Sequence, residues 1–177
     1  MTHQLSSTPL LSRQVIRSRV KTLARQIRQH YGEEDVLWVG LMNGAFIFLA
    51  DLARQFPQPI ELAFLRAASY GKKARSSGQV ELDGLEKLDL VGRKVLLIDD
   101  ILDTGRTMSY VSAALLEAGA SDVQSCVLLD KEARREVPFQ ASFKGFVIED
   151  LFVVGYGLDY AEKYRNLPEV WTVKELA

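Results

Sequence analysis

Apolar residues follow a helical period near the start of the chain. Between residues 12 and 30 they recur at spacings of four, three and four, with arginine, lysine and glutamine in between: Ile16, Val20, Leu23 and Ile27. This is the period of an amphipathic helix with one face on the core, and Gly32 provides its stop. We interpret the arginines on the other face as an ordinary solvated surface rather than a polyanion-binding stripe.

Short, continuous apolar runs are the second feature, and they predict buried strands. Such runs occupy residues 35–41, 95–98 and 123–129, and residues 60–67 predict a further strand with an alternating pattern. Helix-compatible segments follow two of them, at residues 46–55 and 108–118. Two strand–loop–helix units require parallel strands, because the chain must cross back over the sheet before the next strand begins. The pattern therefore predicts an α/β fold with a central, mainly parallel twisted sheet flanked by helices.

Composition and charge limit the function. The 177 residues, 47% hydrophobic and 25% charged, suit one compact domain over residues 1–177. The 22 lysines and arginines nearly balance the 23 acids, so neither nucleic acid nor a membrane surface is expected as a partner. No secretory signal or membrane-spanning run is apparent, which predicts a cytoplasmic protein. The single cysteine, Cys126, lies in an apolar run and is interpreted as a buried, inert thiol.

The most informative stretch is residues 95–107, where an apolar strand breaks into acids and then into a small hydroxylated turn. Asp99 and Asp100 leave the sheet at the carboxyl end of this strand, where α/β proteins bind their ligands. The turn that follows offers main-chain N–H groups at a helix start, two threonine hydroxyls and Arg106, all suited to a phosphate monoester. The adjacent carboxylates suit ribose hydroxyls, or Mg²⁺ as oxygen ligands. Together these groups predict a site for a sugar phosphate.

Three other interpretations of this stretch are weaker. An apolar run that ends in acids is also the Walker B pattern of P-loop NTPases, but no G-x-x-x-x-G-K-[ST] segment occurs in the sequence. Phosphate-accepting receiver domains place their acid pair after the first strand, whereas several elements precede Asp99 here. Capping of the following helix explains one acid, not three acids in five residues.

Residues 98–107, Ile-Asp-Asp-Ile-Leu-Asp-Thr-Gly-Arg-Thr, resemble the phosphoribosyl-diphosphate motif of type I phosphoribosyltransferases, with Asp99-Asp100 where many members have Glu-Asp. Two later stretches, 129–137 and 150–168, resemble the hypoxanthine phosphoribosyltransferase subfamily. The resemblance extends from about residue 36 to the end of the chain. It implies a small hood built from the N- and C-terminal segments and a flexible loop, and it implies a 6-oxopurine as the base.

The activity that this resemblance implies is transfer of the 5-phosphoribosyl group from phosphoribosyl diphosphate to hypoxanthine or guanine. Pyrophosphate is released, IMP or GMP is formed in purine salvage, and Mg²⁺ is the cofactor. Relatives form homodimers and homotetramers, so a homo-oligomer is expected. An alternative is a regulator of the same fold that binds phosphoribosyl diphosphate and nucleic acid without useful catalysis. The presence of Asp103, Lys131 and Asp159 argues against the regulator.

The resemblance also implies the site residues. Asp103 is the candidate catalytic acid or base near the purine N7. Phosphoribosyl diphosphate is bound by Asp99, Asp100, Asp103, Thr104, Gly105, Arg106, Thr107, Met42, Asn43, Gly44, Ser69, Tyr70 and Arg165. The purine is bound by Lys131, Phe152 and Val153, and the metal by Asp99, Asp100 and Asp159. The alternative for Phe152 is an ordinary core aromatic.

Two loops carry further expectations. Residues 42–44 resemble the family's pyrophosphate loop, with a non-proline cis peptide bond at Met42-Asn43. Many relatives carry Lys or Arg where this chain has Asn43, so the loop is expected to rely on main-chain N–H groups. Residues 69–84 are poor in apolar side chains and open on Ser69-Tyr70. They predict a mobile catalytic lid, and a solvated surface hairpin is the alternative.

Overall fold

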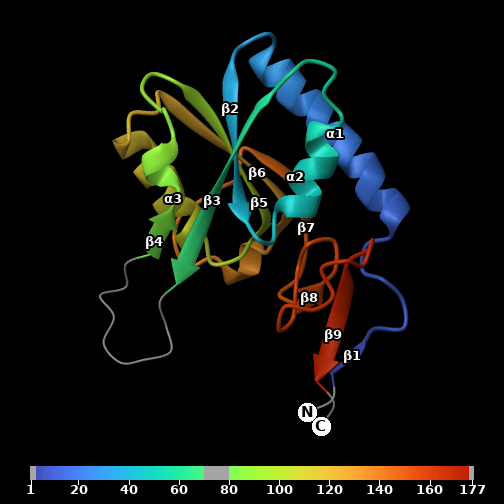
Figure 1. Ribbon diagram of the computed structural model, residues 1–177. Coiled ribbons are helices and arrows are strands. Elements are labelled where there is room, and N and C mark those ends of the chain that lie inside the picture. The colour runs from blue at the N-terminus through green and yellow to red at the C-terminus, as the bar shows by residue number, and fades with distance from the viewer. Residues whose placement is uncertain (1–2, 70–79, 176–177) are drawn as a thin grey trace, which may run out of the picture.

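A six-stranded sheet, ordered β4-β3-β2-β5-β6-β7, forms the centre of the computed structural model, which describes residues 3–69 and 80–175 (Figure 1). The parallel strands are β2 (Val36–Met42), β3 (Glu61–Ser69), β5 (Lys94–Leu102), β6 (Asp122–Asp130) and β7 (Phe143–Val147). At one edge β4 (Val80–Asp83) pairs antiparallel with β3. The predicted, mainly parallel sheet is therefore confirmed.

Helices cover both faces of this sheet (Figure 1). α1 (Arg13–Tyr31) and α2 (Phe46–Ala53) lie on one face, and α3 (Arg106–Glu117) lies on the other. The Ser12 hydroxyl caps α1 by accepting a hydrogen bond from the main-chain N–H of Val15 at 3.4 Å. All four apolar positions that set the helical period of α1 are buried, so the predicted amphipathic helix is confirmed. None of the described helices is long and apolar enough to cross a membrane.

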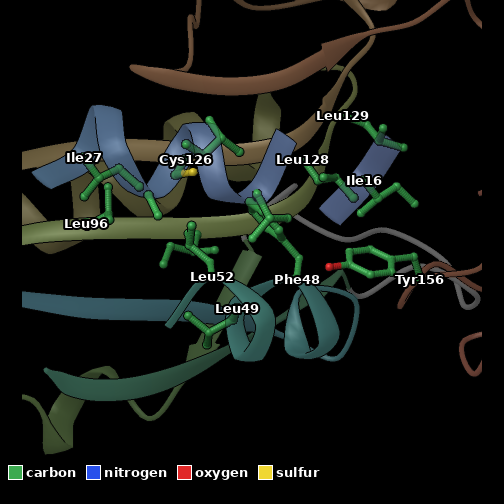
Figure 2. Close-up of a cluster of buried hydrophobic side chains, with 14 of the residues drawn as sticks. Ile16, Ile27, Phe48, Leu49, Leu52, Leu96, Cys126, Leu128, Leu129 and Tyr156 are labelled. Atoms are coloured by element: carbon green, nitrogen blue, oxygen red, sulfur yellow. The ribbon is translucent and has the colours of Figure 1, made fainter. Parts of the chain in front are cut away.

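The core beneath α1 and α2 brings together side chains from both helices and from the sheet (Figure 2). Phe48 comes from α2, and Cys126 comes from β6. Cys126 is fully buried and burial raises the pKa of its thiol, which agrees with the predicted inert cysteine. The hydroxyl of Tyr156 reaches the same region and donates a hydrogen bond to Asp51 of α2 at 2.7 Å. This bond links the C-terminal part of the chain to the core.

A second sheet, with three antiparallel strands in the order β1-β9-β8, forms the hood. Its strands are β1 (His3–Leu5), β8 (Val153–Val154) and β9 (Trp171–Glu175). An isolated bridge between Leu11 and Val170 extends the pairing toward α1. Because β1 and β9 come from opposite ends of the chain, a hood made from the N- and C-terminal segments is confirmed.

Several boundaries differ from the sequence prediction. β5 continues to Leu102, so Asp99 and Asp100 lie within the strand instead of leaving the sheet after it. α3 begins at Arg106, so Thr107 lies in its first turn instead of in the preceding loop. Within the predicted lid, β4 pairs with β3 through Ser69 and Val80, so a strand replaces the last part of the expected loop. Residues 70–79, including Tyr70, lie outside the described residues, and the roles of Ser69 and Tyr70 stay predictions. Two short 3-10 helices, η1 (Leu85–Lys87) and η2 (Glu132–Arg134), complete the described elements.

Candidate active site

The predicted site residues collect at the carboxyl ends of neighbouring parallel strands. Met42 ends β2, Leu102 ends β5 and Asp130 ends β6, and these strands are adjacent in the sheet. The loops that leave them meet along one edge, which is where α/β sheets bind ligands. The hood reaches the same edge, because a Cβ on its Gly157 would lie 2.2 Å from the Gly44 carbonyl oxygen.

The turn from β5 into α3 depends on a glycine. Gly105 has a φ of +85°, a backbone conformation that is strained for any other residue. A Cβ there would also lie 2.9 Å from Cδ of Arg135, so the Arg135 side chain would have to move. The Thr104 carbonyl accepts a hydrogen bond from Glu136 N at 2.9 Å, which holds the turn in place. The first N–H groups of α3 follow directly, and such groups suit a phosphate. Arg106 is already paired with Glu136, with 2.6 Å between Nε and Oε2.

Two adjacent carboxylates lie beneath this turn. Burial raises the pKa of Asp99 well above its usual range, and the neighbouring charge of Asp100 raises it further. Burial also raises the pKa of Asp100, against the lowering influences of hydrogen bonds and of the Arg165 charge. The Asp100 N–H donates to Asp99 Oδ1 at 2.9 Å. Two adjacent carboxylates repel each other, so a cation or a hydroxyl donor that binds between them would be stabilised.

The loop at residues 42–44 packs directly on these acids. The peptide bond between Met42 and Asn43 is cis, as the family resemblance implies. A Cβ on Gly44 would lie 2.0 Å from Oδ2 of Asp100, so only glycine fits against the carboxylate. The predicted pyrophosphate loop and the predicted ribose-binding acid are therefore in contact.

The hood adds an arginine and a carboxylate beside this loop. Arg165 donates from Nη1 to the Gly157 carbonyl at 2.8 Å, and its Nη2 lies 2.8 Å from Oδ1 of Asp159. Glu162 also pairs with Arg165, at 3.1 Å. Asp159 thus holds Arg165 in place. No three acidic, histidine or cysteine side chains within residues 3–69 and 80–175 gather closely enough to hold a metal ion. Asp159 therefore does not form a three-carboxylate cluster with the acid pair of β5.

Four charged side chains join the base side of the site to the phosphate turn. Lys131 follows β6 with its side chain only 7% exposed, and its Nζ lies 3.6 Å from Oδ1 of Asp150. Arg134 Nη1 lies 3.3 Å from the same Asp150 oxygen, and Arg134 Nε lies 3.0 Å from Oδ1 of Asp103. The ion pairs thus run from the predicted base ligand to the predicted catalytic acid. Sequence reasoning missed Asp150 and Arg134 as site residues, although both lie in stretches that carried the family resemblance.

Phe152 and Val153 differ in their surroundings. The Phe152 side chain is 52% exposed and its ring meets that of Tyr160 edge to face, with the centroids 5.6 Å apart. This exposure rules out the alternative of an ordinary core aromatic. Val153 is buried in β8 and pairs with Thr172 of β9. The exposed ring therefore stands at a fixed edge of the hood, where it is available to a planar ligand.

A cavity of about 450 Å³ lies elsewhere, between α1, α2 and the hood. Arg13, Arg17 and Arg54 line it together with Asp51 and Tyr156. None of the predicted site residues does, so this hollow is separate from the edge of the sheet where the acids and glycines converge.

Known proteins share this architecture and sequence. Residues 7–161 match the family model described as the phosphoribosyl transferase domain. The hypoxanthine-guanine phosphoribosyltransferase of Aquifex aeolicus is 47% identical over 94% of this chain and 94% of its own length. A crystal structure of a hypoxanthine-guanine phosphoribosyltransferase from Bacillus anthracis has a TM-score of 0.85 at 32% identity, covering 98% of this chain and 100% of that chain.

A Trypanosoma cruzi hypoxanthine phosphoribosyl transferase is also similar, with a TM-score of 0.86 and 31% identity over 98% of this chain and 94% of that chain. It was solved in a study of its C-terminal region, oligomeric state and enzymatic activity. Such identity and coverage go well beyond a shared fold. The chain is therefore a member of the phosphoribosyl transferase family.

Proposed function

We propose that the protein transfers the 5-phosphoribosyl group from phosphoribosyl diphosphate to hypoxanthine or guanine, releasing pyrophosphate and forming IMP or GMP. The relatives that carry this activity match the chain over nearly its whole length. The observation that carries the proposal is the packing of Gly44 against Asp100. This contact places the main-chain loop that would bind the leaving pyrophosphate beside a carboxylate that would bind the ribose.

The chemistry requires stabilisation of a ribose that gains positive charge as pyrophosphate leaves C1. Asp99 and Asp100 hold the ribose hydroxyls and place negative charge near the ring. Residues 103–107 hold the 5′-phosphate through main-chain N–H groups and threonine hydroxyls. The loop at 42–44 holds the leaving pyrophosphate. Asp103 exchanges a proton with the purine N7, and its contact with Arg134 keeps its carboxylate oriented between the phosphate turn and the base.

Asp99 and Asp100 also fit the magnesium that the family implies. Their oxygen atoms are the ligands that Mg²⁺ prefers, and a cation would relieve the repulsion that raises the pKa of Asp99. When bound there, Mg²⁺ would neutralise negative charge on the leaving pyrophosphate. The resemblance to the family adds Asp159 as a third residue that would hold the metal, since Mg²⁺ prefers carboxylate oxygens together with substrate oxygens and waters. Asp159 also pairs with Arg165 at 2.8 Å.

The purine lies between the hood and the end of β6. Phe152 stacks on its face, and the main chain of Val153 pairs with its edge. Lys131 donates a hydrogen bond from its ammonium group to the oxygen at C6, which adenine lacks. Lys131 is buried with its Nζ 3.6 Å from Asp150, and an ammonium has three N–H donors, so donors remain for the purine oxygen.

We further propose that the protein works in the cytoplasm as a homodimer or homotetramer. Phe46 of α2 and Leu62 and Phe64 of β3 are 40–50% exposed, an apolar surface that a second copy would cover. Light scattering coupled to size exclusion measures the state directly.

Turnover tests the function. Hypoxanthine, phosphoribosyl diphosphate and Mg²⁺ are mixed with the protein, and IMP and pyrophosphate are quantified separately. Equal amounts of the two products, formed only when all three components are present, are expected. Binding of phosphoribosyl diphosphate without turnover would instead indicate a regulator.

A further inference from the structure

Charge is distributed unevenly along this chain. Helix α1 contains five arginines and one lysine but no aspartate or glutamate, whereas the whole chain has 22 basic and 23 acidic residues. A net charge near zero therefore conceals one strongly basic helix. Clustering of arginine and lysine along a helix is typical of surfaces that bind nucleic acids.

Five of the six cations form a row along α1: Arg13, Arg17, Lys21, Arg25 and Arg28. The first four are separated by four residues each, a spacing that makes them neighbours on the helix surface, about 6 Å apart along the axis. The whole row is about 22 Å long, since each residue of an α-helix adds about 1.5 Å.

This row lines a groove at the junction of α1 and α2, which lie side by side (Figure 1). The cavity of about 450 Å³ described above takes in Arg13 and Arg17, with Arg54 from the end of α2. A second hollow of about 330 Å³ is lined by the other three cations of the row. Gln55 borders both hollows, so they form one continuous depression, which we call the α1–α2 groove.

The cations of the row are not neutralised. The side chains of Arg13, Arg17 and Lys21 form no hydrogen bond or ion pair with any residue that the structure describes. The other two cations of the row donate only to neutral groups, the Thr22 hydroxyl at 3.2 Å and the Gln55 carbonyl at 2.6 Å. All five therefore keep a charge that an anion in the groove could use.

Asp51 is the one acid among the described residues that line either hollow. It pairs with Arg54 and accepts a hydrogen bond from the Tyr156 hydroxyl at 2.7 Å. Six cations against one acid leave the groove with a net charge of +5. A two-fold contact with a second copy through this groove would oppose like charges, so the groove stays open to another partner.

The shape of the groove favours a single strand over other polyanions. A small phosphate ester would meet only one or two cations of a row about 22 Å long. None of the groove residues is among the exposed large apolar side chains of the described chain, and a recess between helices does not fit the flat surface of a membrane. A nucleic acid duplex is stiff, whereas a single strand can follow a curved groove.

On this basis we propose that the α1–α2 groove binds the phosphate backbone of a single-stranded nucleic acid. This function goes beyond phosphoribosyl transfer and does not depend on it. No exposed aromatic side chain of the described residues lines the groove, so bases lack a stacking surface and the phosphates provide the contacts, with little preference for sequence. The proposal replaces the expectation, drawn from the balanced composition, that the basic side of α1 is only solvated and that nucleic acid is not a partner.

Fluorescence anisotropy with a labelled oligouridine of about twelve nucleotides measures the binding. At about 0.1 M salt the Kd should lie between about 10⁻⁶ and 10⁻⁴ M, the range of binding through phosphates alone. Contacts with about four phosphates should make log Kd rise with log salt concentration at a slope of about 3. Saturating phosphoribosyl diphosphate and Mg²⁺ should not displace the oligouridine, because the groove is separate from the site at the sheet edge.

A double variant, Arg17→Gln with Lys21→Gln, tests the groove itself. It should raise the Kd by about tenfold or more and lower the salt slope by about 1.4, because two phosphate contacts are lost. Neither residue belongs to the proposed active site, so kcat/KM for hypoxanthine should change by less than about twofold.

The matched control is Arg19→Gln with Lys87→Gln, which removes the same charge elsewhere. Arg19 lies over the Phe146 ring of β7 on the other side of α1, and Lys87 belongs to η1. Neither lines the groove, so the Kd and the salt slope should stay at their wild-type values.

The proposal would be overturned if the oligouridine did not bind, or if the control variant lost as much affinity as the groove variant. Displacement of the oligouridine by phosphoribosyl diphosphate and Mg²⁺ would place it in the active site and also overturn the proposal. Equal competition by a duplex, by tripolyphosphate or by anionic vesicles, at the same phosphate concentration, would show that the groove does not select a single strand. Absence of turnover by the wild-type protein would instead remove the proposed transferase function and leave this inference intact.

Discussion

Replacement of Lys131 by methionine tests how the site distinguishes purines. Methionine keeps the apolar stem that lies in the buried part of the side chain but removes the ammonium. Hypoxanthine and guanine then lose a charged hydrogen bond to the oxygen at C6. Such a bond contributes about 1.5 to 3 kcal/mol, so kcat/KM for either base should fall by about 10- to 140-fold.

The cost to folding should be much smaller. Lys131 lies 3.6 Å from Asp150, a residue whose side chain is 47% exposed and which keeps Arg134 as a second partner at 3.3 Å. The loss of one half-exposed ion pair is worth about 0.2 to 1 kcal/mol. The variant should therefore stay folded, with a small change in Tm, while its discrimination against adenine decreases.

Steady-state kinetics with hypoxanthine, guanine and adenine measure this effect. Wild-type protein should reject adenine by roughly 10⁴-fold, because the amino group at C6 is a donor that offers the Lys131 ammonium no acceptor. Lys144→Met is the matched control: Lys144 also pairs with acids near the end of β6, at 3.4 Å from Asp130 and 2.6 Å from Glu132, but lies outside the predicted site. If kcat/KM for hypoxanthine in Lys131→Met stayed within about threefold of the wild-type value, the role given to Lys131 would be refuted.

Three further variants probe other groups of the site. Asp103→Asn should lower kcat by about 10² to 10⁴-fold with little change in Tm, because the acid–base group is lost while the shape is kept. Gly44→Ala should lower kcat/KM for phosphoribosyl diphosphate by about 10²-fold, since its Cβ, 2.0 Å from Asp100 Oδ2, displaces loop or carboxylate. Asp99→Asn should raise the Tm of the ligand-free protein, because burial and Asp100 disfavour the ionised Asp99 carboxyl, while weakening phosphoribosyl diphosphate binding by about tenfold or more.

The pH dependence gives Asp99 a second readout. A carboxyl whose pKa is raised on folding stabilises the protein in its protonated form, so that stability is lost as pH rises through the folded pKa. As pH rises from the usual carboxyl pKa toward the raised pKa of folded Asp99, the Tm of the ligand-free wild-type protein should therefore fall more steeply than the Tm of Asp99→Asn. Parallel curves of Tm against pH would show that the pKa of Asp99 is not raised. Retention of more than about a third of kcat by Asp103→Asn, or normal kinetics in Gly44→Ala, would equally exclude the roles given to those residues.

The strand–loop–helix units and the phosphate turn could be predicted from the sequence, because they depend on neighbouring residues. The apolar residues 95–98, the acids after them and Gly105 lie within one short stretch, so the buried strand and the turn after it follow from neighbouring residues, although β5 continues through the acids to Leu102. The amphipathic period of α1 has the same local origin. The hood strands and the pyrophosphate loop were expected from resemblance to a family, since neither has a distinctive pattern of its own. β4 was not expected, because its pairing partner, β3, decided its conformation.

Only the tertiary structure decided which charges meet. Asp150 pairs with Lys131 and Arg134 because the chain returns past the end of β6 after forming β7. Gly44 touches Asp100 because β2 and β5 are neighbours in the sheet although β3 and β4 separate them along the chain. Electrostatic interactions act across space between distant segments, so no local pattern of residues encodes them.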